Sequence, residues 1–128
     1  RSIQGNKSTR RVGEMKIKFN ADDSKVIKSN ETYDVIDNTN LKNLIVSKTI
    51  LHPKKNTSGH NHSGQEEVYV FIWGNGKMRV DDKTYIVGEG DVILIPDGAF
   101  HKVWNQDELL DMEFICVFDG GRNHESNG

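Results

Sequence analysis

The sequence predicts an all-β protein. Short apolar runs rich in β-branched and aromatic residues, such as residues 44–51 and 67–73, recur along its 128 residues, and such runs are typical of strands. Turn-forming residues separate these runs at intervals of roughly eight to twelve residues, which is the spacing of a sandwich or barrel. Since no segment has the apolar period of an amphipathic helix, strands are expected throughout.

Four strands are expected in the first part of the chain. Residues 14–19 alternate apolar side chains with lysines, which is the pattern of a half-buried strand. Residues 26–27 and 33–36 are weaker strand candidates beside polar turn residues. Residues 44–51 form the firmest candidate, and it ends before Pro53 because proline donates no hydrogen bond to a sheet.

The strand expected at residues 67–73 is apolar on both faces. Tyr69, Phe71 and Trp73 share one face with Glu67, and valine and isoleucine side chains form the other face. This composition predicts a strand that is buried on both sides. An ionised Glu67 is costly in such a place unless a cation compensates it.

Turn signals organise the second half of the chain. Asn75-Gly76 predicts a tight type I′ hairpin after the strand at 67–73, and residues 96–98 (Pro-Asp-Gly) predict a tight turn just before His101. Residues 92–95 form a continuous apolar run, which predicts a buried strand. The remaining strands are expected at 77–80, 84–87, 102–104 and 109–118.

Four potential metal ligands lie close together in the sequence pattern. His60 and His62 are two residues apart, so on an extended strand their imidazoles point to the same face. Ser63-Gly64 permits a turn that resets the phase before Glu67. His101 follows much later, so only a folded-over or closed sheet brings it back. Three imidazoles and one carboxylate suit a first-row divalent metal.

A structural role is the alternative for each histidine. A single histidine on an apolar face is usually a core residue whose hydrogen bonds are satisfied. Here three histidines and Glu67 together provide four ligand-capable side chains, so we expect a bound metal. His52 is interpreted as a surface residue at a strand end. His124 is interpreted as part of a polar tail.

Two sequence patterns contain the potential ligands. The pattern H-x-H-x4-E-x6-G is present at His60, His62, Glu67 and Gly74, and G-x5-P-x-G-x2-H-x3-N is present at Gly90, Pro96, Gly98, His101 and Asn105. These residues resemble the two sequence motifs of the cupin family. The resemblance covers about residues 40–119 and is to small single-domain cupins of the cupin 2 conserved-barrel type, such as the phosphomannose isomerase-like proteins. The pattern departs at Lys54, where cupins usually carry glycine.

The resemblance implies a double-stranded β-helix, that is, a jelly-roll cupin barrel with a metal inside. It implies His60, His62, Glu67 and His101 as metal ligands and a divalent transition metal (Mn, Fe, Ni, Co, Cu or Zn) as cofactor. We expect one domain: an N-terminal arm with edge strands at 1–40, the barrel core at 41–119, and a flexible tail at 120–128. A homodimer is expected by analogy, because small cupins commonly dimerise through sheet extension.

Composition excludes several classes of partner. A net charge of −2 gives no electrostatic footprint for nucleic acid. The single cysteine, Cys116, excludes an intramolecular disulfide and favours a reducing, cytoplasmic setting. No apolar run is long enough for a signal peptide or a membrane span. With nucleic acid and membrane not expected, a small-molecule substrate is the expected partner. The sequence starts at Arg1 rather than at methionine, which leaves upstream residues open.

The favoured hypothesis for function is a sugar or sugar-phosphate isomerase or epimerase. The metal would hold the substrate's oxygens while a base moves a proton. Tyr69, Glu66 and Glu113 are the candidate catalytic acids and bases. Lys77, Arg79 and Lys102 are candidate phosphate ligands, although such side chains are more often solvated surface charges.

Two alternatives stay open. The first is an iron-dependent dioxygenase that acts on a small thiol or aromatic substrate in an apolar pocket with Cys116 facing it. The second is a non-enzymatic metal- or ligand-binding module. The aromatic residues that would line the dioxygenase pocket are Phe71, Trp73, Phe100, Trp104 and Phe114.

Overall fold

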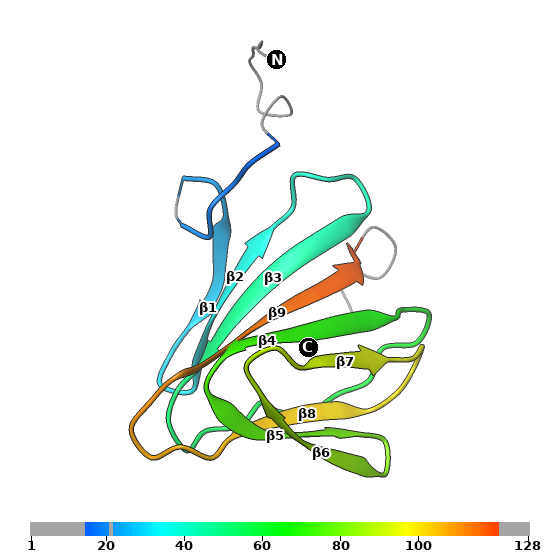
Figure 1. Ribbon diagram of the computed structural model, residues 1–128. Helices are drawn as coiled ribbons and strands as arrows, with labels where there is room; N and C mark the ends of the chain where they lie inside the picture. The colour runs from blue at the N-terminus through cyan, green and yellow to red at the C-terminus, as the bar shows by residue number, and fades with distance from the viewer. Residues whose placement is uncertain (1–14, 21, 121–128) are drawn as a thin grey trace.

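The computed structural model describes residues 15–20 and 22–120, and it has the all-β fold that the sequence predicts. The described residues form nine strands (Figure 1). Their bounds are β1 (Lys25–Ser29), β2 (Tyr33–Asn38), β3 (Leu44–Leu51), β4 (Glu67–Trp73), β5 (Asn75–Val80), β6 (Lys83–Gly88), β7 (Val92–Ile95), β8 (His101–Asn105) and β9 (Met112–Asp119).

The strands form two antiparallel sheets that face each other as a jelly-roll barrel (Figure 1). The larger sheet has the order β1-β2-β3-β9-β4-β7, and the smaller has the order β6-β5-β8. Strand β9 pairs with β3 on one side and with β4 on the other, so it joins these two strands in the larger sheet. This topology brings segments that are distant in sequence to one interior.

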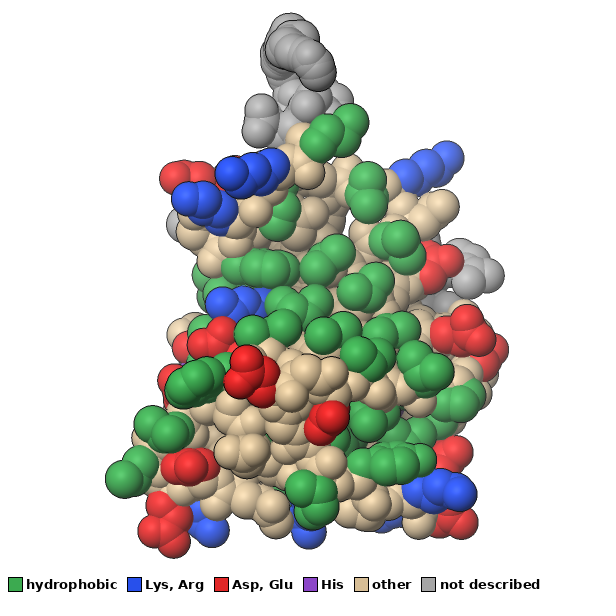
Figure 2. Space-filling model, viewed as in Figure 1, with side chains coloured by type: hydrophobic (Ala, Val, Ile, Leu, Met, Phe, Trp, Pro, Cys, Tyr) green, Lys and Arg blue, Asp and Glu red, His purple; other side chains and the backbone are tan. Residues whose placement is uncertain are grey.

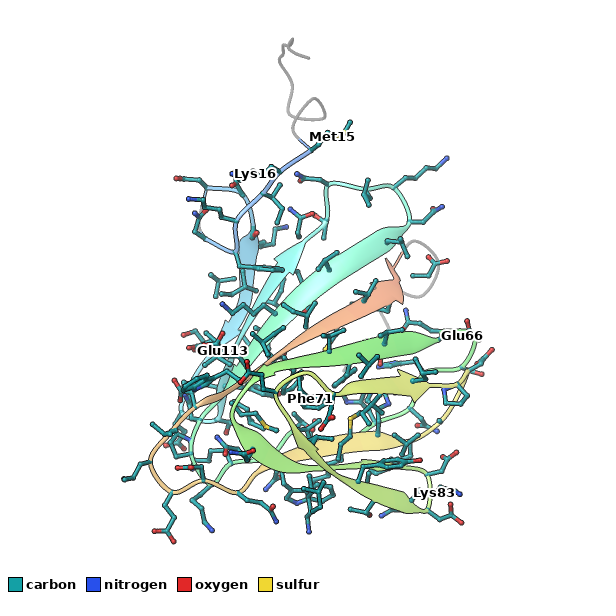
Figure 3. All side chains as sticks on the ribbon, in the orientation of Figure 1. Met15, Lys16, Glu66, Phe71, Lys83 and Glu113 are labelled. Atoms are coloured by element: carbon teal, nitrogen blue, oxygen red, sulfur yellow. The ribbon has the colours of Figure 1, made fainter. Side chains whose placement is uncertain are left out.

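The core lies between the two sheets and follows the strand period. Along β9, buried and half-buried side chains alternate at every position, as expected for a strand with one face inward. Phe71 of β4 and Phe114 of β9 are almost completely buried, with ring centroids 5.3 Å apart. Burial of each large apolar side chain stabilises the fold by roughly 1.5–3 kcal/mol, so this cross-strand pair stabilises the packing of β4 and β9. Figure 3 shows Phe71 between the two sheets.

The first expected strand is not formed. Residues 15–19 lie outside both sheets, and Met15 is 93% exposed, while Glu14 lies outside the described residues. One edge of the larger sheet is β1, and in the described part of the chain its only neighbour is β2. Alternation alone does not make a strand without a partner for its backbone hydrogen bonds.

The hairpin predicted at Asn75-Gly76 is wrong, because β4 and β5 belong to different sheets. The chain changes sheet at Gly74, whose φ of 93° favours glycine. Gly76 serves close packing instead: a Cβ there would lie 2.0 Å from the carbonyl oxygen of Trp104 on β8. The glycine is therefore required by the approach of two backbones and not by a turn.

Two further predictions about burial are corrected. Val92 and Leu94 of β7 are 52% and 70% exposed, because β7 is an edge strand of the larger sheet. The outward face of β4 is also only partly covered, and Ile72 is exposed. Figure 2 shows hydrophobic side chains gathered on this outward region of the molecule.

The last strand begins later than predicted. Residues 109–111 precede β9, which starts at Met112. The carboxylate of Asp107 accepts hydrogen bonds from the backbone nitrogens of Leu109 and Leu110, at 2.8 and 2.9 Å. These bonds hold a turn and leave the two leucines exposed.

Among the described residues, no helix is long and apolar enough to cross a bilayer.

Candidate metal centre

Backbone hydrogen bonds join the two segments that carry the histidines. His60 and His101 form an isolated antiparallel bridge. The amide of His60 donates to the carbonyl of His101 at 3.2 Å, and the amide of His101 donates back at 3.0 Å. The turn at 96–98 adds a bond from the amide of Gly98 to the carbonyl of His62, at 3.0 Å. The two segments are therefore held together before any side chain contributes.

The three imidazoles converge on one point. One ligand-capable nitrogen from each of His60, His62 and His101 lies within 4.8 Å of the other two. The ring centroid of His60 is 4.7 Å from that of His62 and 4.9 Å from that of His101. His62 and His101 are buried, and His60 is half-buried. This geometry fits three nitrogen ligands of one ion.

Glu67 brings a carboxylate to the same place. It is the first residue of β4, and it is buried. Its Oε1 lies 2.9 Å from Nε2 of His101, yet neither atom makes a hydrogen bond of good geometry among the described residues. Buried polar atoms without a hydrogen-bond partner call for an explanation, and a bound cation supplies one.

The backbone contact of His101 selects one tautomer of the neutral ring. Its Nδ1 lies 3.1 Å from the carbonyl oxygen of Ala99. A carbonyl oxygen only accepts, so Nδ1 carries the proton and donates it. Nε2 then presents its lone pair to the centre of the cluster, which is how a metal-binding histidine is usually oriented.

The surroundings favour neutral imidazole at His60. Its pKa is lowered from 6.5 to about 4, mainly by burial and also by the neighbouring charges of His101 and His62, against a smaller opposite effect of Glu67. A neutral imidazole is the form that binds a metal. His60 is therefore ready to act as a ligand at neutral pH.

Asn105, the last residue of the second motif, has a structural role. Its side-chain amide is buried and donates to the carbonyl oxygens of Leu51, His52 and Leu110, at 2.9, 3.2 and 2.9 Å. These bonds tie the end of β8 to the end of β3 and to the loop before β9. The amide therefore fixes the strand that begins with His101.

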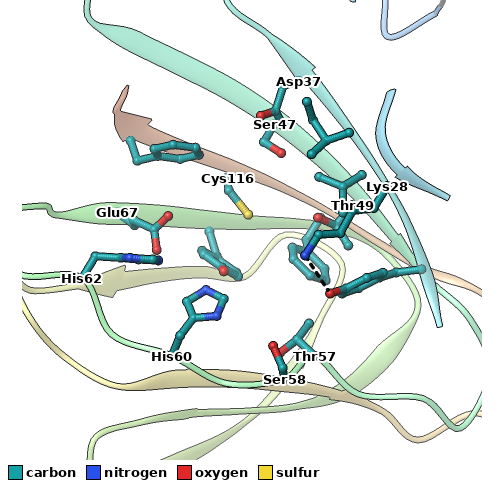
Figure 4. Close-up of a pocket in the computed structure, with 16 residues that line it drawn as sticks. Lys28, Asp37, Ser47, Thr49, Thr57, Ser58, His60, His62, Glu67 and Cys116 are labelled. Carbon is teal, nitrogen blue, oxygen red and sulfur yellow. Dashed lines mark hydrogen bonds between the residues drawn. The ribbon is translucent and has the colours of Figure 1, made fainter. Parts of the chain in front are cut away.

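A cavity of about 310 Å³ opens beside the cluster (Figure 4). His60, His62 and Glu67 form part of its wall. The inward faces of β1, β2 and β3 contribute charged and hydroxyl side chains, and β4 and β9 contribute aromatic ones. The polar side chains of the wall are Lys28, Asp37, Ser47, Thr49, Thr57 and Ser58. This volume suits a small organic molecule.

The three candidate catalytic residues lie in different surroundings. Tyr69 lines the cavity, with its ring centroid 5.7 Å from that of His101. Burial raises the pKa of its hydroxyl well above 10, and the neighbouring Cys116 and Glu67 raise it further. Glu66 is exposed outside this cavity, and Glu113 pairs with Lys48 at 3.2 Å (Figure 3). Only Tyr69 is therefore placed beside the histidine cluster.

The three candidate phosphate ligands lie outside the cavity wall. Lys77 and Lys102 lie over the ring of Trp104, 4.9 and 5.3 Å from its centroid. Arg79 lies over Phe100, 4.9 Å from its centroid. These cations cover aromatic rings on the smaller sheet instead of facing the cluster.

Of the five aromatic residues expected around a pocket, Phe114 lines the cavity and the other four do not. Phe71 is core, and Trp73 is half exposed. Cys116 lines the cavity as a buried thiol whose pKa is raised by burial and by Glu67. His52 lies away from the cluster, between Asp34 and Asp111, and His124 lies outside the described residues.

The polar wall formed by β1, β2 and β3 was not predicted from the sequence. Lys28, Asp37, Ser47 and Thr49 look like ordinary surface residues in the sequence. The alternation of Ser47 and Thr49 along β3 was a usable signal, because i and i+2 share a face. No such signal exists in the sequence for Lys28, because a β-bulge in β1 between Val26 and Lys28 determines which face of the sheet its side chain lies on.

A family model described as a cupin domain matches residues 47–118, which include all four expected ligands. The chain belongs to the cupin family. The match spans more than half of the chain and starts within β3. Family membership explains the fold and the position of the histidine cluster together.

Curated relatives of this cupin are distant. A mannose-1-phosphate guanylyltransferase from Sinorhizobium fredii is 28% identical over 75 residues, which are 59% of this chain and 14% of that protein. An oxalate-binding protein from Thermotoga maritima is 30% identical over 67 residues, which are 52% of this chain and 54% of that protein. The matched segments thus span about half, or less, of these relatives.

Solved structures show the same fold at low identity. The structure of KdgF from Halomonas sp. has a TM-score of 0.70 at 12% identity and covers 84% of this chain and 96% of that one. An RmlC-like cupin from Shewanella frigidimarina has a TM-score of 0.69 at 14% identity, with 82% and 91% coverage. At these identities the likeness concerns the fold alone.

Proposed function

We propose that this cupin binds one divalent metal through His60, His62, Glu67 and His101, and that it takes a small oxygen-rich organic acid in the adjoining cavity. The observation that carries the proposal is the convergence of three imidazole nitrogens within 4.8 Å, two of which belong to histidines that line the cavity, His60 and His62. The buried carboxylate of Glu67 beside them supplies the anionic ligand of the set.

The donor set fits a first-row transition metal. Imidazole nitrogen suits Zn, Cu, Fe and Ni, and a carboxylate broadens the set to Mn. A bound ion of this kind supplies Lewis acidity and open coordination positions for oxygen atoms. The residues of the chain hold the ligand nitrogens in place, keep water from one side of the cluster and present polar groups to the molecule in the cavity.

The cavity wall favours an acid as the bound molecule. The ammonium of Lys28 and the hydroxyls of Thr57 and Ser58 offer hydrogen-bond donors to oxygen atoms. The distant relative named as an oxalate-binding protein supports the same class of ligand. We therefore favour binding of a small carboxylic acid over binding of a sugar phosphate.

Sugar-phosphate isomerisation has less support from the positions of the residues. It needs a base at the cavity, and Tyr69, the candidate placed there, is kept protonated by burial. It also needs cations for a phosphate, and Lys77, Arg79 and Lys102 are not part of the wall. Tyr69 is better suited to donate a hydrogen bond to the bound molecule.

An iron-dependent dioxygenase is the second candidate. Phe114 and Cys116 line the cavity beside Tyr69, which gives an apolar stretch of wall next to Ser47 and Thr49 on the neighbouring strand. Oxygen uptake by the iron-loaded protein with small thiols or catechols tests this candidate. Iron-loaded protein that takes up no oxygen with either substrate class would eliminate it.

The test of the proposed function compares metal-loaded and metal-free protein. Calorimetric titration with oxalate and with glycolate should give saturable binding to the Mn²⁺-loaded protein only. The Mn²⁺ electron paramagnetic resonance spectrum should change on addition of either acid. Binding of the metal with no spectral change and no heat would contradict the proposal, because the coordination positions would then be closed to the acid.

The homodimer expected from the sequence is also part of the proposal. Exposed apolar side chains on the outward face, such as Ile72, Val92 and Leu94, support it, because a second copy would remove them from water. Analytical ultracentrifugation at micromolar concentration gives the test. A monomer at every concentration would exclude the dimer.

A further inference from the structure

A β-bulge in β1 turns Lys28 toward the cavity. In the pairing of β1 with β2, Val26 lies opposite Ile36 and Lys28 lies opposite Val35, so Ile27 is an extra residue on β1. On a regular strand, Val26 and Lys28 would share one face. The bulge instead gives Lys28 the direction of Val35, which lines the cavity. Bulges often re-aim a side chain beside a functional site.

The ammonium group of Lys28 has spare hydrogen-bonding capacity. Its Nζ donates one long hydrogen bond, 3.4 Å, to the hydroxyl of Tyr33, and it lies 5.5 Å from the centroid of that ring. None of the ion pairs within residues 15–20 and 22–120 involves Lys28. An ammonium has three donors, so this half-buried charge can accept an anionic partner.

The position of Lys28 relative to the histidine cluster defines a distance that a ligand must span. Figure 4 shows the amine of Lys28 on the other side of the pocket from Glu67 and His62, with Thr57 and Ser58 below it in this view. A molecule that reaches both places needs one oxygen group at the cluster and a second polar group at Lys28. The hydroxyl of Tyr33 lies beside that second place.

We propose that Lys28, with the hydroxyl of Tyr33, forms a carboxylate subsite, so that the ligand of this cupin is a short acid with a second carboxylate remote from the histidine cluster. The inference rests on the proposed function. A phosphoryl group carries a charge of about −1.5 to −2 near neutral pH. One lysine charge and one hydroxyl match the single negative charge of a carboxylate better. Lys28 thus selects the ligand and has no role in holding the metal.

The experiment uses pairs of probes that differ only in the second charge. Malonate, succinate and glutarate are titrated into Mn²⁺-loaded protein, each beside its monoamide, and 3-phosphonopropionate is titrated beside succinate. For the diacid of the right length, we expect binding about tenfold tighter than that of its monoamide, which corresponds to about 1.4 kcal/mol for one charged hydrogen bond. Lys28→Met should reduce this ratio to about twofold or less, and Lys28→Arg should keep most of it.

Controls separate this inference from the proposed function. Lys48→Met removes a lysine from β3 that pairs with Glu113 outside the cavity wall, so it should leave the diacid preference unchanged. Mn²⁺ binding is measured in every variant, and failure of wild-type protein to bind Mn²⁺ counts against the metal centre instead. With Mn²⁺ bound, an equal affinity for diacid and monoamide, a preference that survives Lys28→Met, or tighter binding of 3-phosphonopropionate than of succinate would each overturn the carboxylate subsite.

Discussion

His60 and His101 exchange two backbone hydrogen bonds, with N···O distances of 3.2 and 3.0 Å. The pair belongs to no regular strand ladder; it is an isolated bridge between the loop before β4 and the first residue of β8. The ring centroids of the two residues are 4.9 Å apart. The backbone, rather than the metal, therefore brings these two ligands together, and the cluster should persist in metal-free protein.

Asn105 should be important for stability. Asn105→Ala leaves the carbonyls of Leu51, His52 and Leu110 without their shared donor, and unsatisfied buried acceptors cost roughly 1–3 kcal/mol each in unfavourable cases. We expect a loss of roughly 3 kcal/mol in the free energy of unfolding, measured by urea denaturation. Asn40→Ala, at an exposed position, is the control and should change little. Equal stability of the two variants would contradict this role of Asn105.

Gly76 should not tolerate a side chain. A Cβ there would meet the carbonyl oxygen of Trp104 at 2.0 Å, so Gly76→Ala must separate β5 from β8. We expect destabilisation of about 2 kcal/mol or more by urea denaturation. In Gly88→Ala the closest atom to the new Cβ is the side-chain oxygen of Asn75, at 2.9 Å, and the nearest backbone atom is 3.6 Å away, so this matched variant should cost less. A reversed order would show that the strands do not approach so closely.

The metal-free protein should lose stability as the pH falls from 6.5 to about 4. The pKa of His60 is lowered to about 4 in the folded state from its ordinary 6.5, so the unfolded chain binds a proton first. Its contribution to stability is complete above pH 6.5 and decreases through this window. Urea denaturation across pH 7 to 4 measures the effect, and His60→Gln should show a shallower dependence. Parallel curves for the two proteins would refute the assignment to His60.

The sequence predicted the barrel and the grouping of His60, His62 and His101 because both depend on local patterns. The strand at 44–51 and the spacing of His60, His62 and Glu67 can be interpreted from side-chain types alone. The turn at 96–98 was predicted for the same reason, since Pro and Gly restrict the backbone directly. Family membership then fixed how the two halves of the site meet.

The features that the sequence did not predict depend on contacts between distant segments. Gly76 looks like a turn residue until Trp104 of β8 is placed beside it. The direction of Lys28 depends on a bulge that pairs two strands unevenly. Glu113 looks like a site residue, but its place on the outward face of β9 is set by the register of that strand against β3. Such registers are properties of the whole sheet, not of a local run of residues.

The central claim is a metal held by His60, His62, Glu67 and His101, and metal content measures it most directly. Wild-type protein, His101→Ala and His52→Ala are purified without chelator and without nickel affinity, and then analysed for metal by mass spectrometry and for folding by circular dichroism. We expect close to one ion per chain in wild-type protein and in His52→Ala, and a loss of roughly 100-fold or more in metal affinity for a folded His101→Ala. A folded His101→Ala that retains the metal as wild-type protein does, or a wild-type protein that binds none after incubation with Mn²⁺, Fe²⁺, Co²⁺, Ni²⁺, Cu²⁺ or Zn²⁺, would contradict the account.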